Sequence, residues 1–126
     1  EPGWAAMRLA LQDRRTELLV RAVRDHLADF THTLPTLLAD GSAASIHFWF
    51  AGFDGLRRQL YPSLVDAYQA WCAGDAGRSL QRHTGQGALH FTRLAEQVLA
   101  LHAQHADAAG THIESLLSSP LAVCRA

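Results

Sequence analysis

Histidines are the side chains of this sequence best suited to chemistry, because imidazole binds metals and haem iron and titrates near neutral pH. Half of the eight histidines, at positions 90, 102, 105 and 112, fall within one expected C-terminal helix over 88–117. At about 100° per residue, His102, His105 and His112 share the apolar side of this helix, and His90 lies at its border. The pattern predicts imidazoles on a buried face, where they bind a ligand or are held by hydrogen bonds.

The most specific hypothesis for these residues is a metal or haem site built from His26, His102, His105 and His112. His102 and His105 stand one helical turn apart, and His26 lies on the inward stripe of an expected helix that begins near residue 16. No carboxylate stands among these histidines to complete a motif such as HExxH, so the spacing alone is a weak signal. Structural histidines, interfacial histidines and a pH sensor are the alternatives. The cofactor stays open among haem, a cobalamin-like tetrapyrrole and zinc, with none as the default.

The aromatic run around residues 47–53 supplies a second set of candidates. Helical spacing places Trp49, Phe50 and Phe53 on one side and His47 and Phe48 on the other. The plain interpretation is the central helix of a bundle. The alternatives are a subunit interface at His47 and Phe48 and the wall of a pocket for a flat apolar ligand. The candidate ligand-binding residues are Trp49, Phe53, Trp71, His83 and His102.

Catalytic motifs are missing from the sequence. There is no GxSxG, no P-loop and no GxGxxG after a strand. Cys72 and Cys124 belong to no CxxC pair, and Cys72 is expected on an inward stripe as a small hydrophobe. We therefore predict that the protein is not an enzyme.

Composition limits the class of protein. The length of 126 residues predicts one domain, 1–126. The net charge of −1 gives no excess of basic residues for binding the phosphates of a nucleic acid. The first residues carry no export signal, and no apolar run is long enough to span a membrane, so we expect a cytoplasmic protein. All eleven basic residues are arginine, as in proteins of GC-rich bacteria. The 48% hydrophobic share against 18% charged residues indicates a partner surface, in the simplest case a homodimer.

Helical periodicity dominates the chain, and no alternating strand pattern appears. We expect an all-α fold, a helical bundle or globin-like array of about five helices with a long C-terminal helix. Pro35 should end the helix before it, Gly41 should close a short segment, and Ser42 should cap the next helix. That next helix either breaks near Asp54, which could serve as an N-cap, or continues through Gly52 and Gly55, and the sequence leaves both alternatives open. A further helix should have Pro62 in its first turn. After it we expect a turn at 74–77, a short helix over 78–83, a loosened joint at 84–87 and the long helix over 88–117.

One local pattern resembles a known family. Leu60-Tyr61-Pro62-Ser63-Leu64, followed by Trp71 and Gly74, is similar to the helical half of cobalamin-binding transcriptional regulators and light sensors. The resemblance implies that Trp71 faces the upper ligand of a corrin. The chain departs from the family where a glutamate-histidine pair is expected, since it has Gln81-Arg82 with His83 one position late, and the family's Rossmann-like half is absent.

Together these features favour a bacterial sensory or regulatory domain that precedes a signalling output domain. Ligand-dependent or dimer-dependent helix packing would control that output. A haem- or metal-binding protein that uses the inward histidines, and an adaptor or dimerisation module without a ligand, are the alternatives.

Overall fold

The computed structural model describes residues 2–105 and 109–125, and helices make up most of them. No strand occurs among those residues, which confirms the all-α prediction. The elements in chain order are α1 (Pro2–Ala28), the π-helical η1 (Asp29–Thr33), α2 (Leu34–Asp40), α3 (Ala43–Ala51), α4 (Gly55–Leu60), α5 (Leu64–Cys72), α6 (Arg78–His105), α7 (Ala109–Leu117) and the 3₁₀-helical η3 (Pro120–Ala122). None of these helices is both long and apolar enough to cross a membrane.

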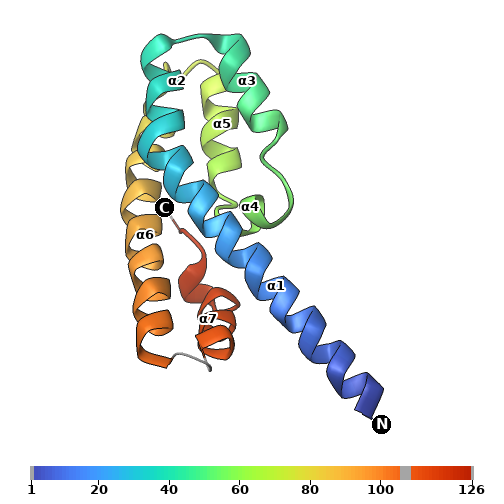
Figure 1. Cartoon of the computed structure of the whole chain (residues 1–126). Coiled ribbons are helices and arrows are strands. Elements are labelled where there is room, and N and C mark those ends of the chain that lie inside the picture. The colour runs from blue at the N-terminus through green and yellow to red at the C-terminus, as the bar shows by residue number, and fades with distance from the viewer. Residues whose placement is uncertain (1, 106–108, 126) are drawn as a thin grey trace.

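The helical path that begins with α1 continues past Pro35, so the prediction that Pro35 ends the helix before it was wrong. The chain stays helical from α1 through η1 into α2, where Pro35 occupies one of the first two positions. The N–H of Leu34 donates to the oxygen of Asp29, five residues back, which is the π-helical pattern. This wider turn lies beside Pro35, which has no backbone N–H to donate. In Figure 1, α2 stands more upright than α1.

The following turns agree better with the sequence. Gly41 ends α2 in the left-handed region, with φ 71°, and its N–H donates to the oxygen of Leu37. Ser42 caps α3 by accepting a hydrogen bond from the N–H of Ser45. Of the two alternatives left open there, the structure has the break near Asp54, since α3 ends at Ala51 and α4 begins at Gly55. α5 begins at Leu64 rather than at Pro62.

The C-terminal third is arranged differently from the prediction. α6 runs without interruption through the expected joint at 84–87 and ends at His105. α7 then packs back against α6 and α1, so no single helix spans 88–117 (Figure 1). The tail returns to the body, where the N–H of Cys124 donates to the oxygen of Leu60 at 2.8 Å.

The core lies where α1 and α6 meet α5, α7 and η1. Its largest fully buried side chains are Tyr61, Phe30, Phe91, Leu34, Leu64, Leu80 and His26. Only the second half of α1 contributes to this core. Its first half leaves the body and ends far from the other helices (Figure 1).

Candidate functional site

His26 lies fully buried in the aromatic core, as the sequence predicted. Its ring centroid lies 4.6 Å from that of Phe91 and 5.4 Å from that of Phe30. Nε2 is 2.6 Å from the backbone oxygen of Arg57, which can only accept, so Nε2 carries the proton. Nδ1 is buried and has no hydrogen-bond partner among the described residues. Burial lowers the pKa of His26 to about 4, which keeps the ring neutral.

The other members of the expected metal set do not join His26. His102 and His112 are exposed, so the prediction that both lie on a buried face was wrong. The side chain of His105 lies outside the described residues. Among the described residues no three His, Cys, Asp or Glu side chains are placed to hold a metal ion. His102 lies near the end of α6, and α7 buries Ala109, Ile113 and Leu117 rather than His112.

His83 is buried and pairs with Tyr61. The Tyr61 hydroxyl lies 3.0 Å from the His83 backbone oxygen and 2.9 Å from its Nδ1. Because the carbonyl can only accept, the hydroxyl proton goes there, and Nδ1–H of His83 donates to the Tyr61 oxygen. Burial lowers the pKa of His83 and raises the pKa of the Tyr61 hydroxyl above its usual range. Both side chains are thereby held neutral and fixed, which is a structural role.

The expected ligand-binding residues lie in separate places. Trp49 stacks on Phe53 with centroids 5.3 Å apart, whereas Trp71 packs against His47 at 4.8 Å. His83 belongs to the Tyr61 cluster, and His102 is exposed. Trp49 and Phe53 line two different pockets, and neither pocket is lined by Trp71, His83 or His102, so the five residues do not surround one shared pocket.

The outward side of α3 is as the sequence predicted. Phe48 is 83% exposed, and His47 is exposed while its Nδ1 lies 2.5 Å from the Tyr68 hydroxyl. Cys72 is exposed instead of lying on an inward stripe, so that expectation was wrong.

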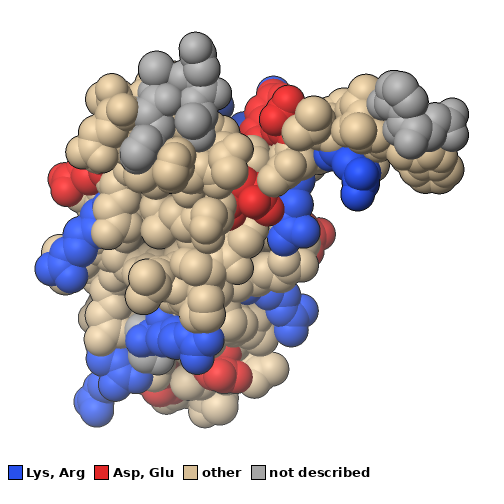
Figure 2. Space-filling view, turned by 90° about the horizontal axis from the view of Figure 1, so that it is seen from below, with Lys and Arg blue, Asp and Glu red and all other residues tan. Residues whose placement is uncertain are grey.

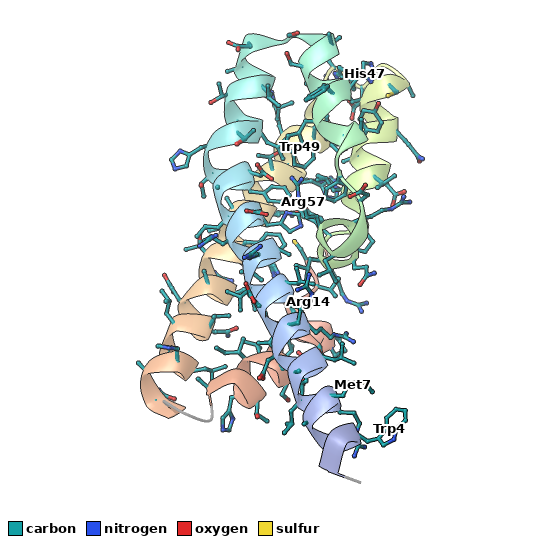
Figure 3. All side chains as sticks on the ribbon, turned by 45° about the vertical axis from the view of Figure 1, so that its right-hand side comes forward. Trp4, Met7, Arg14, His47, Trp49 and Arg57 are labelled. Carbon is teal, nitrogen blue, oxygen red and sulfur yellow. The ribbon has the colours of Figure 1, made fainter. Side chains whose placement is uncertain are left out.

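Arg57 is a connecting residue that the sequence did not single out. Its guanidinium forms a partly buried ion pair with Asp29 of η1 and lies 5.3 Å from the ring centroid of Trp49. Its Nη1 donates to the oxygen of Gly52 at 3.3 Å. One side chain thus links the π-helical turn to α3 and α4 (Figure 3).

The first half of α1, residues 2–15, which we call the α1 arm, carries four of the nine large hydrophobic side chains that are exposed among the described residues. Every side chain described in it is exposed, and Trp4 and Leu11 are each 60% exposed. Trp4 and Met7 project from the arm away from the body (Figure 3). The arm leaves the body next to Gln12, whose side chain donates to Glu114 of α7 at 3.4 Å, and stands clear of it when seen from below (Figure 2).

The apolar stripe of the arm is not a continuation of the core face of α1. At about 100° per residue, Trp4, Met7, Leu11 and Leu18 fall within about 60° of one another. This stripe is turned by about a quarter of the helix circumference from the face that buries Leu19, Val23 and His26. The positions that continue the core face into the arm hold Arg8, Gln12 and Arg15. The stripe therefore has a direction of its own.

Comparison with models of protein families gives a match over most of the chain. A family model described as a family of unknown function (DUF6866), C-terminal domain, matches residues 1–120. No curated protein and no solved structure matches the chain.

Proposed function

The chain belongs to the DUF6866 C-terminal domain family, and from this we propose that it is a regulatory helical domain that docks through the α1 arm onto a domain preceding it. The family description supports this partner, since a C-terminal domain implies another domain earlier in the same polypeptide. This proposal keeps the sensory or regulatory role expected from the sequence. It changes the expected order of the domains, because the sequence analysis placed the regulated output domain after this one. In this proposal the regulated domain precedes the α1 arm.

The observation that carries the proposal is the exposed apolar stripe on the arm. Large apolar side chains that stand together on an exposed helix mark a contact surface for another protein surface. Trp and Met are among the side chains enriched at interfaces. A stripe with members at positions 4, 7, 11 and 18 matches the i, i+3, i+7 spacing by which a helix seats in an apolar groove.

The same helix offers a path from the partner to the core. The arm continues without interruption into the half of α1 that packs on α6 and α7, and then into η1. A partner that moves the arm would therefore act on the residues around His26 and on the ion pair between Asp29 and Arg57. Regulation would consist of a change in how α1 packs on α6.

Hydrogen exchange on a longer family protein would test the docking, with the 126-residue chain as reference. We expect the amides of residues 3–15 to exchange fast in the isolated chain and to be protected in the longer protein. Leu11→Asp should remove that protection, because it places a carboxylate in the apolar stripe. Ala6→Asp adds the same charge to the arm on the other side and should leave the protection intact.

Two results would contradict the proposal. The first is equal exchange of the arm in the isolated chain and in the longer protein. The second is a dimer of the isolated chain in sedimentation that Leu11→Asp converts to monomer, because the occupant of the stripe would then be a second copy.

A further inference from the structure

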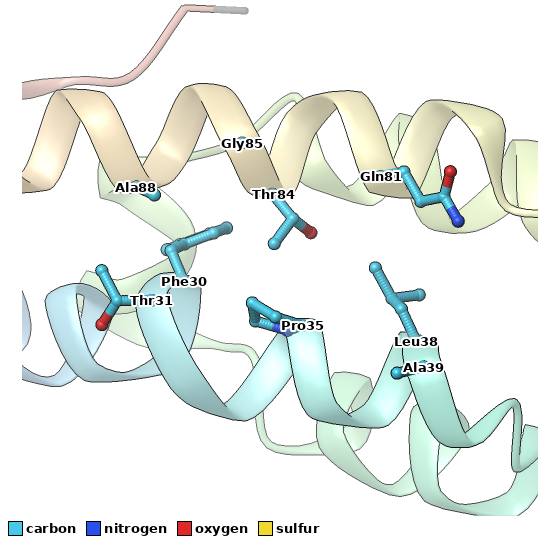
Figure 4. A pocket seen from close by; sticks show the side chains of 9 residues that line it. All are labelled: Phe30, Thr31, Pro35, Leu38, Ala39, Gln81, Thr84, Gly85 and Ala88. Atoms are coloured by element: carbon cyan, nitrogen blue, oxygen red, sulfur yellow. The ribbon is translucent and has the colours of Figure 1, made fainter.

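A groove lies between α2 and α6. It is at the other end of the continuous helical path α1–η1–α2 from the arm. Its volume is about 570 Å³, within the range of small-molecule sites. Figure 4 shows side chains from η1 and α2 facing side chains from α6 across it. The lining residues are Phe30, Thr31, Pro35, Leu38, Ala39, Gln81, Thr84, Gly85 and Ala88.

Thr84 gives this groove a specific polar group. The residue is only 5% exposed, and its Oγ1 is buried without a hydrogen-bond partner among the described residues. The side chain points from α6 toward α2, into the groove (Figure 4). By contrast, the hydroxyl of Thr31 on the opposite wall is engaged, since it donates to the oxygen of Leu27 at 2.6 Å. A buried hydroxyl with no partner is costly, so Thr84 is the group that a ligand would satisfy.

The walls define the chemistry of that ligand. None of the nine lining residues carries a charge, and the polar side chains besides Thr84 are Thr31 and Gln81. An ion would lose its hydration here without gaining a countercharge. The remaining lining residues are aliphatic and aromatic, with the ring of Phe30 at one end of the groove and Leu38 at the other (Figure 4). The fit is to a neutral, mostly apolar molecule.

The backbone around the groove is unusual in a way that accompanies binding sites. The π-helical turn η1 supplies Phe30 and Thr31, and Pro35 follows one turn later. Single π-helical turns inside longer helices occur frequently at functional sites. Gly85 on the facing helix leaves room, because a Cβ placed there would meet nothing within 4 Å.

We propose that the groove between α2 and α6 binds a small neutral apolar molecule with one hydrogen-bonding oxygen, which pairs with the hydroxyl of Thr84. This site is independent of the docking of the α1 arm, since it uses other residues and needs no partner domain. Phe30 is shared with the aromatic core, where its ring packs against His26, so an occupied groove would contact the core directly.

Nuclear magnetic resonance titration of the 126-residue chain tests the site, with 1-naphthol and naphthalene as probes. The two molecules share a fused apolar ring system and differ in one hydroxyl. We expect 1-naphthol to shift the amide signals of residues 81–88 and 30–39, and to bind about tenfold more tightly than naphthalene because of one added hydrogen bond. Thr84→Val, which keeps the shape of the side chain, should abolish that preference.

A matched pair of glycine variants separates the groove from the rest of the surface. Gly85→Leu fills the groove and should remove binding of both probes. Gly110→Leu makes the same change at a helical glycine of α7 that also has open space around it, and should leave binding unchanged. The proposal is overturned if neither probe shifts the groove signals, if Gly85→Leu binds as well as the unaltered chain, or if Thr84→Val keeps the preference for 1-naphthol.

Discussion

Nε2 of His26 lies 2.6 Å from the backbone oxygen of Arg57, and this contact joins the last turn of α1 to α4 across 31 positions of the chain. The only free nitrogen of the ring, Nδ1, faces the aromatic core without a partner among the described residues. A second proton would therefore have to enter apolar surroundings.

The first prediction is a loss of stability in acid. Burial lowers the pKa of His26 from 6.5 to about 4, so below pH 6.5 the unfolded chain binds a proton that the folded chain does not. The stabilisation is complete above pH 6.5 and decreases as the pH falls toward 4, by about 3 kcal/mol in total. Urea unfolding at pH 7 and at pH 4.5 measures this change.

His26→Gln isolates the contribution of this ring. The amide can still donate to the oxygen of Arg57 but cannot titrate, so the variant should lose less free energy of unfolding between the two pH values. His32→Gln, at an exposed position of η1, should keep the full pH dependence. If the unaltered chain and His26→Gln lost the same free energy of unfolding between the two pH values, His26 would be ruled out as the source of the pH dependence.

The second prediction is that Thr84→Val stabilises the domain. The variant replaces a buried hydroxyl that lacks a partner among the described residues, and the expected gain is about 1–2 kcal/mol. Thr16→Val is the matched control, since the buried Thr16 hydroxyl donates to the oxygen of Gln12 at 3.0 Å. That variant should not gain stability. Thermal unfolding of both variants decides the point, and a loss of stability in Thr84→Val would show that its hydroxyl is satisfied.

The third prediction concerns Tyr61→Phe. Removing the hydroxyl leaves Nδ1–H of the buried His83 without its acceptor, which should cost about 1–3 kcal/mol. Tyr68→Phe removes a hydroxyl that bonds to His47 at the surface, and the loss should be smaller. Chemical unfolding of the two variants side by side measures the difference. Equal losses would mean that burial of the Tyr61–His83 pair contributes nothing.

The fourth prediction compares two glycines of α6. A Cβ at Gly87 would lie 2.6 Å from the ring of Phe30, so Gly87→Ala should destabilise the domain by about 1–3 kcal/mol. Gly85→Ala has open space and should stabilise it by up to about 1 kcal/mol through helix propensity. Opposite signs in melting temperature are expected, and a stabilising Gly87→Ala would show that Phe30 moves aside freely.

The sequence allowed the helical class and several boundaries to be predicted because their signals are local. Gly41 and Ser42 determine a helix end and a cap through their own backbone and side chain. His26 was correctly placed inward because Ala22 and Val23 define a clear stripe around it. The resemblance to cobalamin-binding regulators stays a prediction, since neither the fold nor the family match tests it.

The wrong predictions depended on contacts between distant segments. Gly85 and Gly87 suggested a joint, whereas Gly87 is needed so that α6 can approach Phe30. The helical periodicity of 88–117 does not reveal that α6 ends at His105 and that α7 packs back against it, and it therefore predicted a buried His102 that the structure shows exposed. The groove and the hydroxyl of Thr84 were missed because they exist only once α2 lies beside α6.

The tryptophans lie in different surroundings, so their intrinsic fluorescence can report on separate parts of the protein. Trp4 stands in water on the arm, Trp49 lies between Arg57 and Phe53, and Trp71 rests on His47. An indole in water emits at longer wavelength than one in apolar surroundings. Variants that each retain a single tryptophan would therefore give separate emission spectra for the arm, the α3–α4 junction and the outer surface of α5, with no added dye.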